Sequence, residues 1–101
     1  MRISARELAR VTGGILSGEP SVTVTGIISD SRSSGAGSDV LFIALRGPNH
    51  DGHVFIDSLY SRGVRLFLVD TLPSGSATMN EAGFVKVSDT LVALQRLAKW
   101  H

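Results

Sequence analysis

Cysteine is absent from the 101-residue sequence, so neither a disulfide framework nor a thiolate metal site can form. No apolar run approaches the roughly 20 residues that a helix needs to cross a bilayer. The first four residues, Met1 to Ser4, lack the apolar core of a signal peptide. Together these absences predict a cytoplasmic protein without a membrane partner.

A strong charge of either sign is also missing. Ten basic and nine acidic residues give a net charge of +1, whereas a surface that binds nucleic acid normally carries a basic stripe. We therefore expect no nucleic-acid partner. Hydrophobic residues make up 43% of the chain, which is enough for one domain with one core.

Familiar catalytic motifs are missing as well. The sequence has no G-x-x-x-x-G-K-[ST] phosphate loop, no G-x-G-x-x-G dinucleotide motif and no G-x-S-x-G nucleophile turn. Gly35-Ala36-Gly37 lacks the following helix that a dinucleotide motif requires. We therefore expect this chain to hold no catalytic residue and no cofactor, and neither to bind nor to hydrolyse ATP on its own.

The most informative stretch begins with six apolar residues, Val40 to Leu45, and continues with the polar, glycine-punctuated segment 46–53. A short apolar run bounded by turn residues is typical of a strand buried on both faces. A helical stripe beginning near Phe55 and a second apolar run at 64–69 complete a strand–helix–strand unit, whose strands are parallel. Ligands of open α/β sheets bind at the carboxyl ends of the strands, so the segment after Leu45 is a candidate site.

The remaining pattern predicts a three-layer α/β domain with a small mixed sheet. Strands at 40–45, 65–69 and 83–87 form its parallel part. The β-rich segments 15–17 and 22–28, separated by a turn composition, are expected to add an antiparallel edge or hairpin.

Two helices complete the prediction. Ser4 to Glu7 matches a capping box that starts the first helix, and Gly13-Gly14 ends it. The last helix is capped by Ser88 or Asp89. Its inward side chains are predicted to be Leu91, Leu94, Leu97 and Ala98.

A polar turn, Asp30-Ser31-Arg32, directly follows the segment 22–28. A hydroxyl, a carboxylate and a guanidinium at a strand end can position a polar ligand, and the planar guanidinium suits phosphate. The alternative is an Asx or Ser turn with a solvated arginine, and spacing alone favours that alternative.

His50, Asp51 and His53 allow a metal site or an acid–base pair. However, the two histidines lie across a glycine-containing turn and not on one helical face. Asp51 is equally well placed as the N-cap of a helix that begins near His53, and we favour this role. We therefore predict no metal site. The backbone amides of the segment Gly47 to Asn49, apart from Pro48, which has no N–H, remain available to an acceptor-rich ligand.

Four stretches, taken in order along nearly the whole chain, resemble the N-terminal domain of the Mur ligases, the ATP-dependent ligases of bacterial peptidoglycan synthesis that shape the cell wall during growth and division. The stretches are ELARVTGGILSG, TGIISDSR, LFIALRGPNHDGHVFI and RGVRLFLV. The resemblance implies that residues 1–101 bind the UDP part of a UDP-N-acetylmuramoyl-peptide. It also implies that a central ATP-binding domain and a C-terminal domain belong to the full protein.

The resemblance also implies roles for individual residues. The expected UDP-binding residues are Ser31, Arg32, Arg46, Gly47, Pro48, Asn49 and His50. The expected loop-shaping residues are Asp30, Asp51, Gly52 and His53. The sequence departs from the family at residues 37–40, where Gly-Ser-Asp-Val replaces the usual Pro-Gly-Asp before Leu-Phe.

Within the family the resemblance is closest to the branch that adds D-alanyl-D-alanine (MurF). The branch that adds the third amino acid (MurE) is the alternative. ATP and Mg²⁺ are implied only for the full-length enzyme, and pyridoxal phosphate only if the protein is a fusion with alanine racemase, which the segment 57–69 suggests. The chain stops within a helical pattern at residues 99–101, which favours an excised domain that is inactive alone. A non-catalytic interaction module is the competing hypothesis from a different class.

Overall fold

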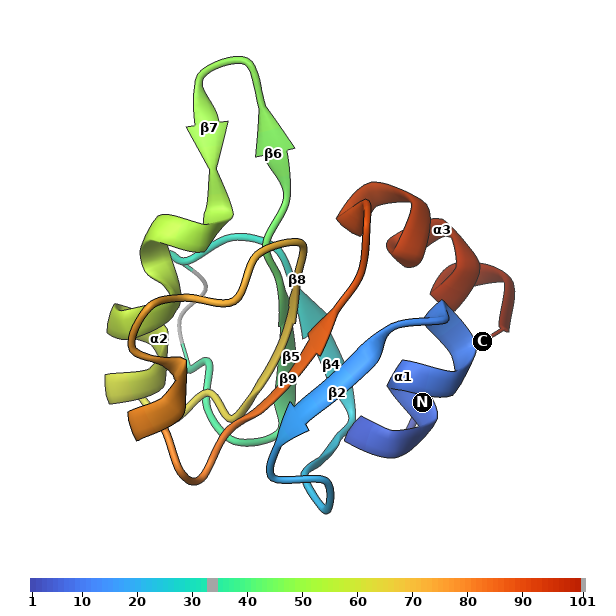
Figure 1. Cartoon of the computed structure of the whole chain (residues 1–101), viewed down its shortest axis with the longest axis horizontal. Coiled ribbons are helices and arrows are strands. Elements are labelled where there is room, and N and C mark those ends of the chain that lie inside the picture. The colour runs from blue at the N-terminus through green and yellow to red at the C-terminus, as the bar shows by residue number, and fades with distance from the viewer. Residues whose placement is uncertain (33–34, 101) are drawn as a thin grey trace.

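The computed structural model describes residues 1–32 and 35–100, which form three layers (Figure 1). Helices α1 (Ala5–Thr12) and α3 (Thr90–Trp100) cover one face of a central sheet, and α2 (Ile56–Ser61) covers the other. The sheet has five strands in the order β2–β9–β8–β5–β4. Their bounds are β2 Ile15–Gly18, β4 Gly26–Ile28, β5 Val40–Ile43, β8 Leu66–Val69 and β9 Gly83–Lys86. The predicted three-layer α/β fold with a mixed sheet is confirmed.

The parallel part of the sheet agrees with the sequence pattern. Strands β5, β8 and β9 are parallel neighbours, with Phe42 opposite Phe67 and Phe67 opposite Phe84. Strand β2 pairs with β9 in the antiparallel direction and forms one edge, as expected for 15–17. A 3₁₀ helix, η2 (Ser76–Thr78), lies in the connection from β8 to β9.

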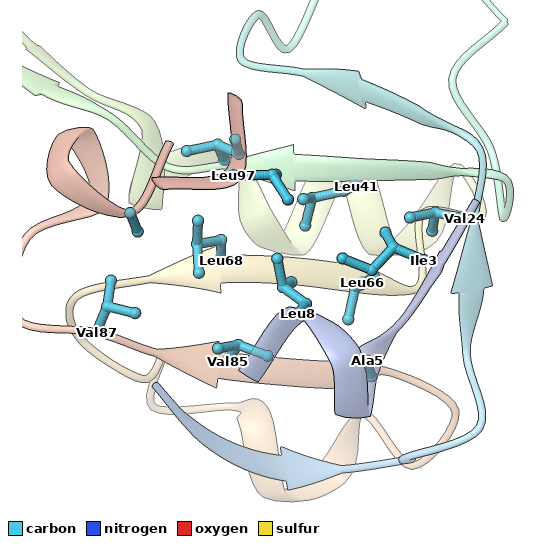
Figure 2. Packing of buried hydrophobic residues seen from close by; sticks show 12 residues of the cluster. Ile3, Ala5, Leu8, Val24, Leu41, Leu66, Leu68, Val85, Val87 and Leu97 are labelled. Carbon is cyan, nitrogen blue, oxygen red and sulfur yellow. The ribbon is translucent and has the colours of Figure 1, made fainter. Parts of the chain in front are cut away.

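Alternation along the strands divides the apolar residues into two clusters. Successive side chains of a strand point to opposite faces, so Leu41 and Ile43 pack toward α1 and α3 while Phe42 packs toward α2. Figure 2 shows the first cluster, where Leu8 of α1 and Leu97 of α3 meet Leu68 of the sheet. Fully burying one such side chain contributes about 1.5–3 kcal/mol, so both helical layers are held mainly by apolar packing.

The start and end of α1 follow the prediction. The hydroxyl of Ser4 accepts a hydrogen bond from the Glu7 amide at 3.1 Å, and the Glu7 carboxylate accepts one from the Ser4 amide at 3.2 Å. Gly13 ends the helix at φ +71°, a left-handed conformation that glycine adopts without a side-chain clash. The capping box and the glycine cap are therefore both confirmed.

The predicted antiparallel role of 22–28 is right for its first part and wrong for its second, and no hairpin with 15–17 forms. Its first part, β3 (Thr23–Val24), pairs antiparallel with β1 (Ile3–Ser4) outside the main sheet. Its second part, β4, pairs parallel with β5 at the edge opposite β2. The turn residues after β2 predict that the chain changes direction, but they do not determine which strand the following segment pairs with. Here the buried Val24 pairs with Ile3, and the chain passes from the β2 edge of the sheet to the opposite edge before β4 begins.

The predicted face of α3 is partly wrong. Asp89 caps the helix, since its carboxylate accepts hydrogen bonds from the Leu91 and Val92 amides. The inward residues are Thr90, Ala93 and Leu97, with Leu94 partly buried, whereas Leu91 and Ala98 are exposed. The buried Thr90 hydroxyl donates to the Ala44 carbonyl at 2.8 Å. This bond holds the N-terminal end of the helix, where Thr90 and Ala93 face inward in place of the predicted Leu91.

Candidate functional site

Two polar segments follow adjacent parallel strands, β4 and β5, and therefore lie at the same edge of the sheet. Between them is a cavity of about 460 Å³, within the usual range for a small-molecule site. It is lined by Ser29, Asp30, Ser31, Arg32, His50 and Phe55. We refer to it as the edge cavity.

The turn after β4 is organised around the Asp30 carboxylate. One of its oxygens accepts the Arg32 amide at 2.8 Å, and its two oxygens accept Nε and Nη2 of the same arginine at 3.2 and 3.1 Å. This is the Asx turn that spacing alone favoured. Hydrogen bonds from Arg32 hold the pKa of the Asp30 carboxyl below its usual value. The Arg32 side chain is 88% exposed, so it can still turn toward a ligand.

A residue of α2's C-terminal end ties this turn to the body of the domain. Nη1 of Arg62 donates to the Ser31 carbonyl at 2.7 Å across 31 positions of sequence. The bond keeps the Ser31 backbone beside α2 while the residue still lines the cavity.

The segment after β5 is a small hairpin. Strands β6 (Arg46–Gly47) and β7 (His50–Asp51) are antiparallel, and Pro48 and Asn49 form the turn between them. The hairpin projects beyond the edge of the sheet (Figure 1). His50 lies 5.9 Å from the Phe55 ring between ring centres, tilted by 30°. The cavity wall opposite the Asp30 turn is therefore made of two flat rings.

The base of the hairpin is held by a network of charged side chains. Arg46 donates from Nε and Nη2 to the two carboxylate oxygens of Asp70, at 2.7 and 2.8 Å. It also donates from Nη1 to Asp51 at 2.9 Å. Asp70 directly follows β8, so the network ties both hairpin strands to the neighbouring strand of the sheet.

His53 completes the network. Its Nδ1 lies 2.7 Å from an Asp51 carboxylate oxygen, and its Nε2 accepts the Asp70 amide at 3.1 Å. This pair of partners fits a neutral ring protonated at Nδ1. Hydrogen bonds from Arg46 lower the pKa of Asp70 from 3.8 to about 2. Hydrogen bonding by the His53 amide is the main cause of a lowered pKa for Asp51.

The chain returns from the hairpin through a 3₁₀ helix, η1 (Gly52–Phe55), that leads into α2. Asp51 is its N-cap and accepts the His53 amide at 2.9 Å, which confirms the predicted capping role. A Cβ atom at Gly52 would lie 3.0 Å from the Ala44 Cα. Glycine is therefore needed where η1 crosses the end of β5.

The structure brings four of the predicted residues together at the edge cavity: Asp30, Ser31, Arg32 and His50. Gly47, Pro48 and Asn49 are exposed on the hairpin and do not line the cavity. Arg46 is occupied by carboxylates, and Asp51, Gly52 and His53 shape the base of the hairpin.

Sequence reasoning missed four residues that matter here: Ser29, Phe55, Arg62 and Asp70. Phe55 was assigned to the helical stripe, although it is only half-buried and also faces the cavity. A signal for Asp70 was available, because it is a polar residue directly after a buried parallel strand.

The cavity suits binding better than catalysis. It combines a guanidinium, a hydroxyl, a carboxylate and two aromatic rings, which can contact an anion, hydroxyl groups and a flat base. Within residues 1–32 and 35–100, no group of three or more His, Asp or Glu is placed to hold a metal ion. No helix among these residues has the length and hydropathy of a membrane span.

The chain is similar to known proteins over most of its length. Residues 23–100 match the Mur ligase family, catalytic domain. Over 100 residues the chain is 35% identical to UDP-N-acetylmuramoyl-tripeptide–D-alanyl-D-alanine ligase of Haemophilus influenzae, covering 99% of this chain and 21% of that protein. Over 88 residues it is 35% identical to UDP-N-acetylmuramoyl-L-alanyl-D-glutamate–2,6-diaminopimelate ligase of Parabacteroides distasonis, covering 86% of this chain and 17% of that protein.

A solved structure agrees with these matches. The crystal structure of MurF from Acinetobacter baumannii has a TM-score of 0.84 and 25% sequence identity, over 99% of this chain and 21% of that one. The chain thus spans about a fifth of the length of the relatives it matches. On these grounds the chain belongs to the Mur ligase family and is MurF-like.

Proposed function

We propose that residues 1–101 form the UDP-binding domain of a bacterial peptidoglycan ligase that adds D-alanyl-D-alanine to a UDP-N-acetylmuramoyl-tripeptide. The observation that supports this most is the convergence of Arg32, Ser31 and His50 on one cavity at the carboxyl edge of the sheet. The match over 99% of the chain to a D-alanyl-D-alanine ligase supports the choice of reaction.

In this proposal each wall of the edge cavity contacts a different part of the ligand. Arg32 turns from Asp30 toward the diphosphate, for which its planar fork is suited. The rings of His50 and Phe55 offer a stacking face to the uracil. Ser31 and Asp30 face the ribose, whose hydroxyl groups can donate hydrogen bonds to a carboxylate. The exposed Gly47, Pro48 and Asn49 lie along the outer side of the ligand.

The remaining parts of the reaction belong to other domains. ATP and Mg²⁺ would be bound by parts of the full-length protein that follow this chain, as would the tripeptide end of the substrate and the incoming dipeptide. Pyridoxal phosphate would be needed only by a fused racemase. This chain alone would then be inactive, and a cytoplasmic location stays a prediction.

A diaminopimelate-adding ligase is the second candidate, because relatives with that activity are as similar in sequence as the D-alanyl-D-alanine ligases. Both activities use a UDP-linked substrate by name, so UDP binding by this chain does not separate them. The two activities are separated by a measurement of which compound, the amino acid or the dipeptide, the full-length protein consumes with ATP.

Calorimetric titration of UDP into the 101-residue chain tests the proposal. We expect weak binding, because the rest of the substrate would contact other domains. Arg32→Ala should raise the Kd at least about tenfold through loss of a charge-assisted contact. Arg10→Ala removes an exposed arginine from α1, across the sheet, and should leave the Kd unchanged. Equal affinity in all three proteins, or no binding at millimolar UDP, would contradict the proposal and favour an interaction module.

A further inference from the structure

We propose that Asp70 is a positioning residue for the edge cavity. Through Arg46 and His53 it holds the β6–β7 hairpin at the angle that brings His50 against the ligand. The inference rests on the proposed function for its ligand, and it gives Arg46 a different role from the direct UDP contact expected from the sequence.

The hairpin cannot hold its position by itself. Each strand has two residues, and the positions from Arg46 to His50 are all exposed. A two-stranded hairpin is marginally stable in water even when it is longer. Its orientation therefore depends on contacts made at its base.

Those contacts converge on Asp70 from both strands of the hairpin. Arg46 of β6 binds its carboxylate through two nitrogens, at 2.7 and 2.8 Å. Asp51 of β7 is joined to the same arginine and, through the His53 ring, to the Asp70 amide. The result is a closed network in which Asp70, the residue directly after β8, is linked to both strands of the hairpin.

Burial makes this network stronger than an ordinary surface ion pair. The side chain of Asp70 is 16% exposed and that of His53 is 11% exposed, whereas that of Arg46 is 50% exposed. A bidentate pair between arginine and a carboxylate also fixes an angle as well as a distance. Asp70 is thus a rigid reference point at the end of a fully buried strand.

The same geometry explains why Arg46 does not line the edge cavity. Nε and both terminal nitrogens of its guanidinium already donate to Asp70 or Asp51. His50 lies on the partner strand, directly opposite Gly47 in the register of the hairpin, and reaches the cavity instead. Arg46 then acts on the ligand only through the position of His50.

A double-mutant cycle read by UDP affinity distinguishes the two roles of Arg46. Under the proposal Arg46→Ala and Asp70→Ala each weaken UDP binding by the same factor, between about two- and thirtyfold. The double variant should be no weaker than either single variant, because both changes release the same hairpin. Asp70→Glu, which keeps a carboxylate, should recover part of the affinity.

Amide NMR spectra of the ligand-free chain provide the second measurement. Asp70→Ala, and the isosteric Asp70→Asn if the first variant does not fold, should shift the amides of 46–51 and leave those of β5 in place. Asp39→Asn changes an exposed aspartate before β5 and should leave the hairpin spectra unchanged.

The outcomes separate this proposal from the proposed function. Unchanged hairpin amide shifts in the Asp70 variants would overturn the positioning role and leave the proposed function intact. The same holds if the Kd of the double variant rises by the product of the two single-variant factors. Absence of UDP binding by the unaltered chain would overturn the proposed function and the ligand-directed part of this inference together.

Discussion

The two polar segments that border the edge cavity are built in different ways. The turn after β4 is organised mainly by neighbours in sequence, since the Asp30 carboxylate binds the amide and guanidinium of Arg32, two positions away. The hairpin after β5 is held by an aspartate 24 positions from its arginine. A local turn can be predicted from its own residues, whereas the hairpin depends on where β8 places Asp70.

The difference extends to the expected response to mutation. In the turn the side chains of Asp30 and Arg32 are 51% and 88% exposed, so water replaces their contacts readily. At the base of the hairpin Asp70 and His53 are largely buried. Loss of a partner there leaves a desolvated polar group, which is the more damaging event.

The largest effect is expected at the close approach beneath the hairpin. In Gly52→Ala the new Cβ atom would lie 3.0 Å from the Ala44 Cα and 3.1 Å from the Leu45 nitrogen, both backbone atoms that cannot turn aside. We expect urea unfolding to show a loss of about 1–3 kcal/mol.

Gly47→Ala is the matched control in the same hairpin, because its nearest atom would be 3.9 Å away. It should change the free energy of unfolding by less than about 0.5 kcal/mol. Equal losses in the two variants would show that the hairpin base is not closely packed.

The next effect is a dependence on acid pH. The pKa of Asp70 is lowered from 3.8 to about 2, so its contribution to stability is complete above pH 3.8 and is lost as the pH falls through about 2. The full shift corresponds to at most about 2.5 kcal/mol. Solvent around the half-exposed Arg46 should reduce this to about 1 kcal/mol.

Unfolding free energies between pH 7 and pH 2 measure this contribution. The unaltered chain should lose more stability below pH 4 than Asp70→Asn does. Asp30 and Glu19, whose pKa values are also lowered, lie outside this network, titrate in both proteins and cancel in the difference. Parallel pH profiles would mean that the ion pair does not stabilise the fold.

A loss of similar size is expected for the cap. Asp51→Ala removes the acceptor of the His53 amide and should lower the free energy of unfolding by about 1 kcal/mol. Asp39→Ala, at an exposed position, serves as its control. If Asp51→Ala abolishes UDP binding while its stability is unchanged, Asp51 acts on the ligand directly or through the hairpin and is not mainly a cap.

The smallest effect on stability is expected in the turn after β4. Asp30→Ala should leave the unfolding midpoint nearly unchanged, because the carboxylate and its arginine are both exposed. It should alter the amide shifts of Ser31 and Arg32, which the Asx turn orders. A large drop in the midpoint would show that this turn is as deeply coupled to the fold as the hairpin is.

Most features held by neighbours in sequence could be predicted, whereas most features held by distant residues could not. The capping box of Ser4 and Glu7, the glycine after α1 and the cap at Asp51 were predictable because their partners lie within four residues. The parallel pairing of β5 with β8 followed from two apolar runs joined by a helix.

The failures involve partners that are distant in sequence. Along the chain, the pairing of β4 with β5 comes after that of Val24 with Ile3, 21 positions earlier in the sequence. The N-terminal end of α3 is held by a hydrogen bond from the Thr90 hydroxyl to the carbonyl of Ala44, 46 positions earlier. The Arg46–Asp70 pair likewise requires β8 to lie beside β5. For the edge cavity, the types of residue and their place at the carboxyl ends of the strands were predictable. The sequence did not predict that carboxylates would bind Arg46.

The most direct test of the account is amide NMR of the 101-residue chain during titration with UDP. We predict progressive shifts at residues 29–32, His50 and Phe55, which line the edge cavity, and in the rest of the hairpin segment 45–53, with little change in α1 or α3. No shifts in these segments at millimolar UDP, or shifts confined to another face of the domain, would contradict the assignment of this cavity to the nucleotide.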